Sequence, residues 1–254
     1  MTPSSCHFVN SALASAIISL MLTGCAQWPA SSSSLDQTEP GACEAGSSPA
    51  DNTRLASIEQ MVNEGKLYAA LAQLDALGNT SPKARMIRAD ALRRIDKDKE
   101  AQALYVGLTG SCMSGRAHHG LGLLAAHRGD QADSIAHLKQ ARLALPTAPD
   151  VRNDLGYAFL LAGMLDDAQF EFLTALDLHP QDARATRNLV LLSFKRGDAG
   201  KAYQLAAKLG LDTPTTDRLA LQAQNLSLPP PNTNQGKDLQ QPLQPMPVAS
   251  SPGA

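Results

Sequence analysis

Aromatic residues are scarce in this sequence, which has one Trp, four Tyr and five Phe among its 254 residues. So few rings argue against a dense aromatic core and against a platform on which nucleic-acid bases stack. Charge of one sign is lacking too, because the formal net charge is -2. Nucleic-acid binders normally carry a strong basic excess, so we expect no nucleic-acid partner.

The sequence also lacks the motifs of common catalytic sites. It has no G-x-S-x-G elbow, no P-loop and no H-E-x-x-H segment. The neighbouring carboxylates Asp166 and Asp167 diverge on a helix, and their charge suits the start of a helix. We therefore expect no catalytic residue, no enzymatic activity and no cofactor.

Metal-ligand spacing is missing as well, although four histidines lie between residues 118 and 137. His119 and His127 share a helix face but are about 12 Å apart along it, too far for one ion. No cysteine or carboxylate completes a ligand set with them. We expect no metal site.

The N-terminus carries a short apolar run, residues 12–22, that is too short for the roughly 20 residues of a membrane span. The run resembles the core of a secretory signal peptide. It ends in Leu22-Thr23-Gly24-Cys25, which resembles a bacterial lipobox, whose cysteine is acylated and becomes the first residue of the mature chain. The resemblance implies a signal peptide over residues 1–24 and lipidation at Cys25. A cleaved signal without lipid and a plain soluble start are the alternatives. Ala26 after the cysteine implies sorting to the outer membrane, facing the periplasm.

The sequence predicts that the segments at both ends of the chain are disordered. Residues 25–50 are rich in Ser, Ala and Pro and predict a disordered tether, and residues 229–254 predict a disordered tail rich in Pro and Gln. Once Cys6 is cleaved off and Cys25 is acylated, Cys43 and Cys112 remain. In an oxidising compartment they are candidates for a disulfide, and two free thiols are the alternative.

The middle of the chain repeats itself with a step of 34 residues. The recurring positions are Leu121, Leu155 and Leu189; Gly122 and Gly156; Gly129, Gly163 and Gly197; Ala141 and Ala175; Ala168 and Ala202; and Pro146, Pro180 and Pro214.

Each recurring residue type has a physical role in a pair of antiparallel helices. Gly156 and Ala168 are small where two helices cross, so that their backbones approach each other. Gly163 allows the turn between the helices. Pro180 stops the second helix, because proline has no N–H and clashes with the preceding turn. The step therefore predicts an all-α array of helical hairpins.

The unit at residues 149–182 resembles the tetratricopeptide repeat at Leu155, Gly156, Phe159, Ala168, Phe172, Ala175 and Pro180. Arg152 stands where the family usually has an aromatic residue, and the preceding unit has Ser134 for the small alanine. The same register gives units at residues 115–148 and 183–214, with shorter or degenerate units near 51–80 and 82–114. The resemblance implies a right-handed superhelix of four to five helix pairs over residues 51–228, closed by a capping helix from residue 215.

In this family the first helix of each pair lines a concave face. By resemblance, the groove of this chain comprises Arg116, His119, Leu123, Asn153, Tyr157, Leu160, Arg184, Arg187, Leu191 and Phe194. The unit near 82–114 adds Lys83, Met86, Asp90, Arg93 and Arg94. The unit at residues 149–182 adds Asp150 at its start. The expected groove is apolar in its deeper part and basic at its edges. Such a surface suits a protein or peptide segment.

The lipobox, the tether, the repeats and the proline-rich tail together resemble the TadD lipoproteins of the tight-adherence (Tad) Flp pilus system. The resemblance is greatest over residues 153–202, with a Leu-Gly repeat followed by an Asn-Leu repeat and a Gly-Asp turn. It implies a pilotin-like factor for localisation or assembly of the pilus secretin. The alternatives are a module that docks peptidoglycan synthesis or other envelope assembly machinery, and an accessory of a hydrolase.

Overall fold

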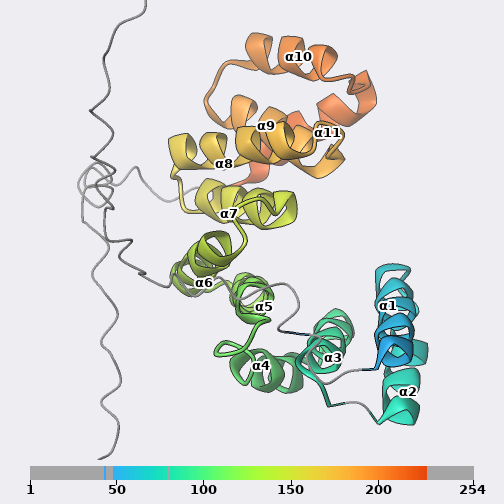
Figure 1. Ribbon diagram of the computed structural model, residues 1–254. Coiled ribbons are helices and arrows are strands. Elements are labelled where there is room, and N and C mark those ends of the chain that lie inside the picture. Colours follow the sequence, from blue (N-terminus) through green and yellow to red (C-terminus); the bar gives the residue numbers. More distant parts are fainter. Residues whose placement is uncertain (1–42, 44–47, 79, 228–254) are drawn as a thin grey trace, which may run out of the picture. The chain divides into compact units, whose positions relative to one another are not determined.

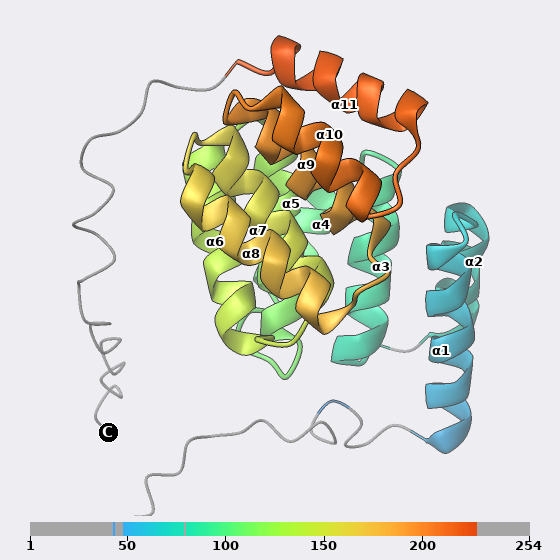
Figure 2. The same cartoon turned by 90° about the horizontal axis from the view of Figure 1, so that it is seen from above.

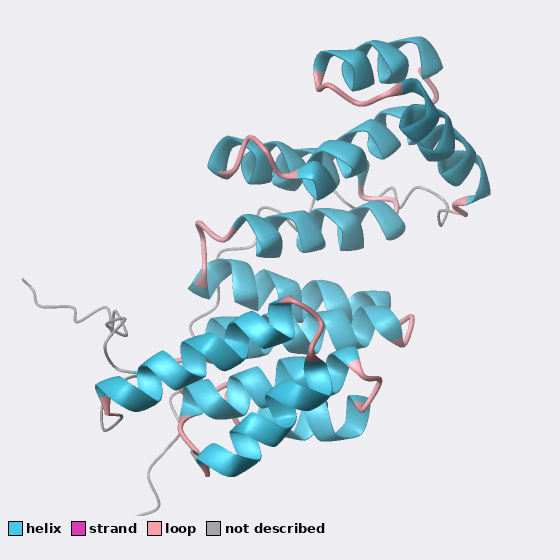
Figure 3. Cartoon of the chain, turned by 90° about the vertical axis from the view of Figure 1, so that its right-hand side faces the viewer, coloured by secondary structure: helices cyan, strands magenta, loops and turns pink. Residues whose placement is uncertain are grey.

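The computed structural model describes residues 43, 48–78 and 80–227, all of which lie in the unit Thr38–Ala254. The predicted signal peptide, Cys25, most of the predicted tether and the predicted tail lie outside the described residues. The described part of the chain forms eleven α-helices and no strand (Figure 3). They are α1 (Pro49–Asn63), α2 (Leu67–Leu77), α3 (Pro82–Arg94), α4 (Asp98–Val106), α5 (Ser114–His127), α6 (Gln131–Ala144), α7 (Pro149–Leu161), α8 (Leu165–Leu178), α9 (Ala183–Lys195), α10 (Ala199–Lys208) and α11 (Thr213–Asn225).

The helices pair into successive hairpins, from α1–α2 to α9–α10, that follow one another along the array (Figure 1). The second helix of each hairpin also packs against the first helix of the next. In addition, the first helices contact one another in a row, α1 to α3, α3 to α5, α5 to α7, α7 to α9 and α9 to α11. Among the described helices, no comparable contacts join successive second helices. The first helices therefore form the inner surface of a superhelix.

Residues with a left-handed backbone conformation (positive φ) form the turns inside the hairpins. Gly65, Gly129, Gly163 and Gly197 have φ between 75° and 87° where their first helices end. Asp96 has φ 60° at the same place in the α3–α4 hairpin. A side chain is unfavourable in this conformation, so the recurring glycine is a backbone requirement.

Small residues set the distance between paired helices, as the sequence predicts. A Cβ atom on Gly156 of α7 would lie 2.7 Å from the ring of Phe172 on α8 and 3.2 Å from the carbonyl oxygen of Ala168. Phe172 and Leu155 are completely buried at this crossing. Similar apolar contacts continue from hairpin to hairpin, so that no hairpin buries its apolar face alone. The all-α fold expected from the 34-residue step is thus confirmed.

Pro214 departs from the expected role of a helix stop. Helix α10 ends at Lys208, six residues earlier, and Pro214 lies in the first turn of α11, whose N-cap is Asp212. Proline is favoured there because its missing N–H has no partner in the helix anyway. Helix α11 packs against α9 and α10 and ends the described array (Figure 2).

Candidate binding groove

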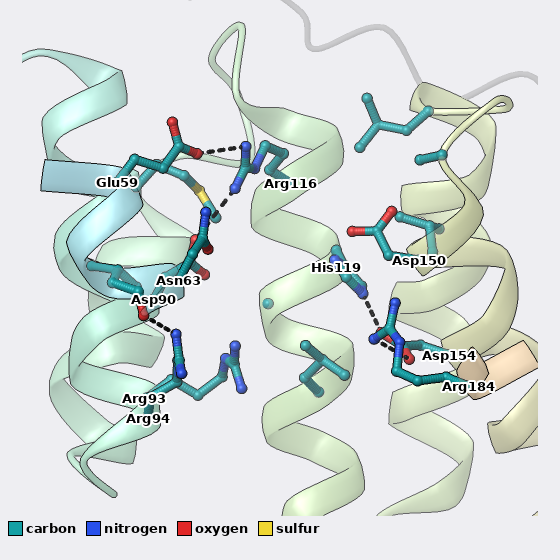
Figure 4. A pocket seen from close by; sticks show the side chains of 17 residues that line it. Glu59, Asn63, Asp90, Arg93, Arg94, Arg116, His119, Asp150, Asp154 and Arg184 are labelled. Carbon is teal, nitrogen blue, oxygen red and sulfur yellow. Dashed lines mark hydrogen bonds and ion pairs between the residues drawn. The ribbon is translucent and has the colours of Figure 1, made fainter. Parts of the chain in front are cut away.

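The row of first helices encloses a cavity of about 660 Å³, to which α1, α3, α5, α7 and α9 all contribute side chains (Figure 4). A second cavity of about 390 Å³ lies next to it and shares Leu123, Asp154 and Arg184 with it. We refer to the two adjoining cavities together as the groove. Four arginines and four carboxylates line the first cavity, so it is balanced in charge where the sequence predicted basic edges.

One cluster of charges in the groove joins α1 to α5. Arg116 on α5 lies 3.0 Å from the carboxylate of Glu59 on α1 and 3.6 Å from that of Asp90 on α3. Burial alone would lower the pKa of Arg116, but Asp90 and Glu59 outweigh it and raise that pKa. Arg116 therefore stays charged and links hairpins that are not neighbours along the array.

A buried tyrosine of α4 is hydrogen-bonded to Asp90 of this cluster. The hydroxyl of Tyr105 on α4 donates a hydrogen bond to Asp90 at 2.6 Å and accepts one from Nε of Arg93 at 3.3 Å. Its ring is fully buried and covers Gly120 so closely that a Cβ atom there would lie 2.3 Å from it. Burial, followed by the charge of Asp90, raises the pKa of Tyr105, so the hydroxyl remains a donor that orients the carboxylate.

A second polar cluster runs from α5 across α7 to α9. Nε2 of His119 donates to Asp154 at 2.7 Å, and the amide of Asn153 donates to the other oxygen of Asp154 at 3.1 Å. The amide of Asn188 in turn donates to the carbonyl of Asn153 at 2.9 Å. Arg184 approaches Asp154 to 4.0 Å. Asn188 thus extends this cluster to α9 through the side chain of Asn153.

The structure brings most of the predicted groove residues together. Arg116, His119, Leu123 and Arg184 line the first cavity. Asn153, Tyr157 and Arg187 line the second, together with Leu123 and Arg184.

Four predicted groove residues line neither cavity: Lys83, Leu160, Leu191 and Phe194. Leu160 and Leu191 are fully buried in the apolar core that joins α6 to α11, so their assignment to the groove was wrong. Both belong to the apolar core shared by successive hairpins. Phe194 is partly buried against the same core and packs edge-to-face on Tyr203, with ring centroids 5.2 Å apart.

Several groove residues are absent from the sequence prediction, among them Asp154, Asn188 and Glu59. Asp154 and Asn188 are 34 residues apart, so the repeat itself could have placed both on the inner face. Glu59 had no such signal, because its own unit is too degenerate to fix a register.

Cys43 and Cys112 form a disulfide, with their Cα atoms 5.5 Å apart and a separation of 69 positions in sequence. The bond links the segment before α1 to the connection between α4 and α5. A small cavity of about 200 Å³ beside it shares Glu59, Met86 and Arg116 with the groove. The disulfide thus lies at the edge of the groove.

The four histidines of the α5–α6 hairpin serve separate contacts. His119 bonds Asp154 and His127 bonds Asp98, whereas Nδ1 of His118 lies 3.1 Å from Nδ1 of His137. In the described part of the chain, no three His, Cys, Asp or Glu residues gather closely enough to hold a metal ion. Nor does any described helix have the length and apolarity of a membrane span.

Comparison with known proteins gives one close relative. The chain is 37% identical over 192 residues to TPR repeat-containing protein PA4299 of Pseudomonas aeruginosa, and the match covers 76% of each chain. The chain belongs to the tetratricopeptide-repeat (TPR) proteins. No protein-family model matches this TPR protein.

Solved structures share the fold of this TPR protein at low identity. The structure of PilF from Pseudomonas aeruginosa matches with a TM-score of 0.55 and 16% identity, over 68% of this chain and 82% of that one. The Cut9–Hcn1 hetero-tetramer of the APC/C matches with a TM-score of 0.58 and 15% identity, over 67% of this chain. This TPR protein spans only 35% of that longer chain. At such identities these likenesses show the fold alone.

Proposed function

We propose that this TPR protein is a non-enzymatic scaffold, anchored by lipid in the outer membrane, that captures a segment of a partner protein in its groove. The observation that carries the proposal is the groove itself, which runs continuously from α1 to α9 along the inner surface. In line with the resemblance to TadD, we propose a pilotin-like role toward the secretin of a Tad/Flp pilus or an associated periplasmic assembly protein.

The lining of the groove suits a peptide better than a small substrate. The second cavity combines the apolar surface of Leu123, Tyr157 and Leu161 with the amides of Asn153 and Asn188. Apolar pockets beside amide groups can hold side chains and main-chain groups of one segment together. The side chains that line the first cavity include no Ser, Thr, Cys or Lys, so it offers no hydroxyl, thiol or amine nucleophile.

The disulfide supports the proposed location. Disulfides persist in oxidising compartments such as the periplasm and are rare in the cytosol. A bond between Cys43 and Cys112 therefore fits a chain that is exported behind the predicted signal peptide and held at Cys25.

The anchor is tested by fractionating cells that express Cys25→Ser. We expect the variant to leave the membrane fraction, because it would lack the acyl chains that hold a lipoprotein on the bilayer. Cys6→Ser is the matched control, since Cys6 lies in the predicted signal peptide, and it should remain with the membrane. Equal membrane retention of all three proteins would contradict lipid anchoring at Cys25.

Capture is tested by co-purification from membranes of the native host. Leu123→Glu combined with Tyr157→Glu places two charges in the groove, whereas Phe170→Glu with Leu173→Glu places two on exposed positions of α8. We expect the secretin to co-purify with the wild type and the α8 variant and to be lost from the groove variant. Undiminished recovery with the groove variant, folded by circular dichroism, would contradict capture in the groove.

A further inference from the structure

Three charged side chains of the first cavity form no direct ion pair with another described residue, although the charge of Asp150 acts on Arg116 from a distance. Arg93 and Arg94 end α3, and Asp150 begins α7, and all three line the cavity. Among the described residues, none of the three forms an ion pair. Arg93 donates its Nε–H to the hydroxyl of Tyr105, and Arg94 donates to the carbonyl oxygen of Val62. Neither contact neutralises a positive charge.

These charges are separated along the cavity. Figure 4 shows Arg93 and Arg94 on one side and Asp150 on the other, with Arg116 and His119 of α5 between them. The other charged groups of the cavity form ion pairs with one another in the two polar clusters. Among the described residues, the cavity therefore presents two cations without an ion pair at one end and one carboxylate without an ion pair at the other.

Arg93 is half-buried, whereas Arg94 and Asp150 are exposed. A charge that lines a concave surface attracts its complement more strongly than it would on a flat surface, because the walls focus the field. Guanidinium groups bind carboxylates through two parallel hydrogen bonds. Arg93 already has one N–H engaged with Tyr105, which fixes its orientation and lowers the entropy lost on binding.

We propose that Arg93 and Arg94 form the docking site for an acidic side chain of the bound segment, and that Asp150 receives a basic side chain further along the same segment. The inference rests on the proposed capture of a protein segment and adds the charge pattern that selects it. A uniformly acidic segment meets Glu59, Asp90 and Asp154, and a uniformly basic one meets the arginines. The partner segment therefore carries charges of both signs, in one orientation along the groove.

A purely structural role for the two arginines makes a different prediction. Cations in the last turn of a helix interact favourably with its C-terminal dipole, here that of α3. That role affects the thermal stability of the protein but not which peptides it binds.

The experiment selects peptides from a phage-displayed random library of about 15 residues on the full chain and on two variants. Arg93→Glu with Arg94→Glu reverses one end of the cavity, and Asp150→Lys reverses the other. We expect wild-type selections to enrich peptides with an acidic and a basic residue at a fixed spacing. The arginine variant should bind those peptides about tenfold more weakly and select a basic residue in place of the acidic one.

Matched controls separate this outcome from general effects of charge or folding. Lys99→Glu with Lys208→Glu makes the same change in net charge on exposed positions outside the groove and should leave the selected peptides unchanged. Arg94→Glu alone keeps the contact of Arg93 with Tyr105 and should weaken binding with little change in melting temperature.

The outcomes distinguish this inference from the proposed function. Enriched peptides that bind the groove without a paired charge pattern, or whose sequences do not change in the variants, would overturn the charge assignment and leave capture intact. Failure of the wild type to enrich any peptide would count against capture of a linear segment, and with it against both proposals.

Discussion

Arg152 on α7 donates a hydrogen bond at 3.0 Å to Glu171 on α8, whose side chain is only 1% exposed. The other carboxylate oxygen of Glu171 accepts from Arg142 on α6 at 2.5 Å. Arg152 occupies the position where TPR units usually have an aromatic ring. An ion triad that joins three helices thus replaces apolar packing at this junction.

Removing Arg152 should therefore destabilise the array more than removing a surface arginine. Arg152→Ala leaves a buried carboxylate with a single partner, and we expect a loss of about 3 kcal/mol in the free energy of unfolding. Urea denaturation followed by circular dichroism measures it. In the background of Glu171→Gln the same substitution should cost much less. Equal costs in both backgrounds would show that the triad is not coupled.

The helix crossing at Gly156 should not tolerate even a methyl group. Gly156→Ala brings a Cβ atom into the ring of Phe172, and we expect a loss of about 1–3 kcal/mol. Gly110→Ala is the control, because a Cβ atom there meets nothing within 4 Å and the backbone is not left-handed. Thermal denaturation of the two variants should give a clearly lower melting temperature for Gly156→Ala alone.

Replacing the buried Ser134 by alanine should stabilise the folded protein. It is fully buried, and its hydroxyl has no hydrogen-bond partner among the described residues. Ser134→Ala removes an unsatisfied polar group at a position where the TPR pattern prefers alanine, so we expect a gain of about 1 kcal/mol. A lower stability by urea denaturation would indicate that the hydroxyl is satisfied in solution.

The His118–His137 contact should make the protein sensitive to mild acid. Burial, followed by the neighbouring His137, lowers the pKa of His118 below its ordinary value of 6.5. Below pH 6.5 the imidazole of His118 takes up a proton more readily in the unfolded chain than in the folded one. The contribution of His118 to stability is therefore fully present above pH 6.5 and is lost as the pH falls below this value. Asp133 lies 3.6 Å from Nε2 of His137 and offsets part of the repulsion.

Melting temperatures of the protein in buffers from about pH 5 to about pH 7.5 measure this effect. His118→Gln should flatten the profile, because the titrating group is gone. A profile as steep as that of the wild type would assign the acid sensitivity to groups other than His118.

The sequence predicts the hairpins well because their requirements are local. A left-handed turn at Gly163 and a close crossing at Gly156 each demand one residue type, and the 34-residue step repeats that demand. The pattern fails at Pro214, where the second helix of the fifth hairpin, α10, is shorter than α6 and α8 and the proline lies in the first turn of the next helix.

The groove was harder to predict because it depends on contacts between hairpins. Leu160 and Leu191 are apolar residues of first helices, and sequence alone cannot show which apolar position faces inward and which faces the next hairpin. The contact of Arg116 with Glu59 joins residues 57 positions apart, and it follows from the curvature of the array. The repeat pattern does not contain that curvature.

The most direct test of a binding groove on the first helices is site-specific photo-crosslinking in native membranes. A photoreactive amino acid at Tyr157 lies in the groove, and the same group at Phe170 lies on the exposed side of α8. We predict one defined crosslinked partner from position 157 and none from position 170. Crosslinks to a partner from position 170 alone would contradict the account.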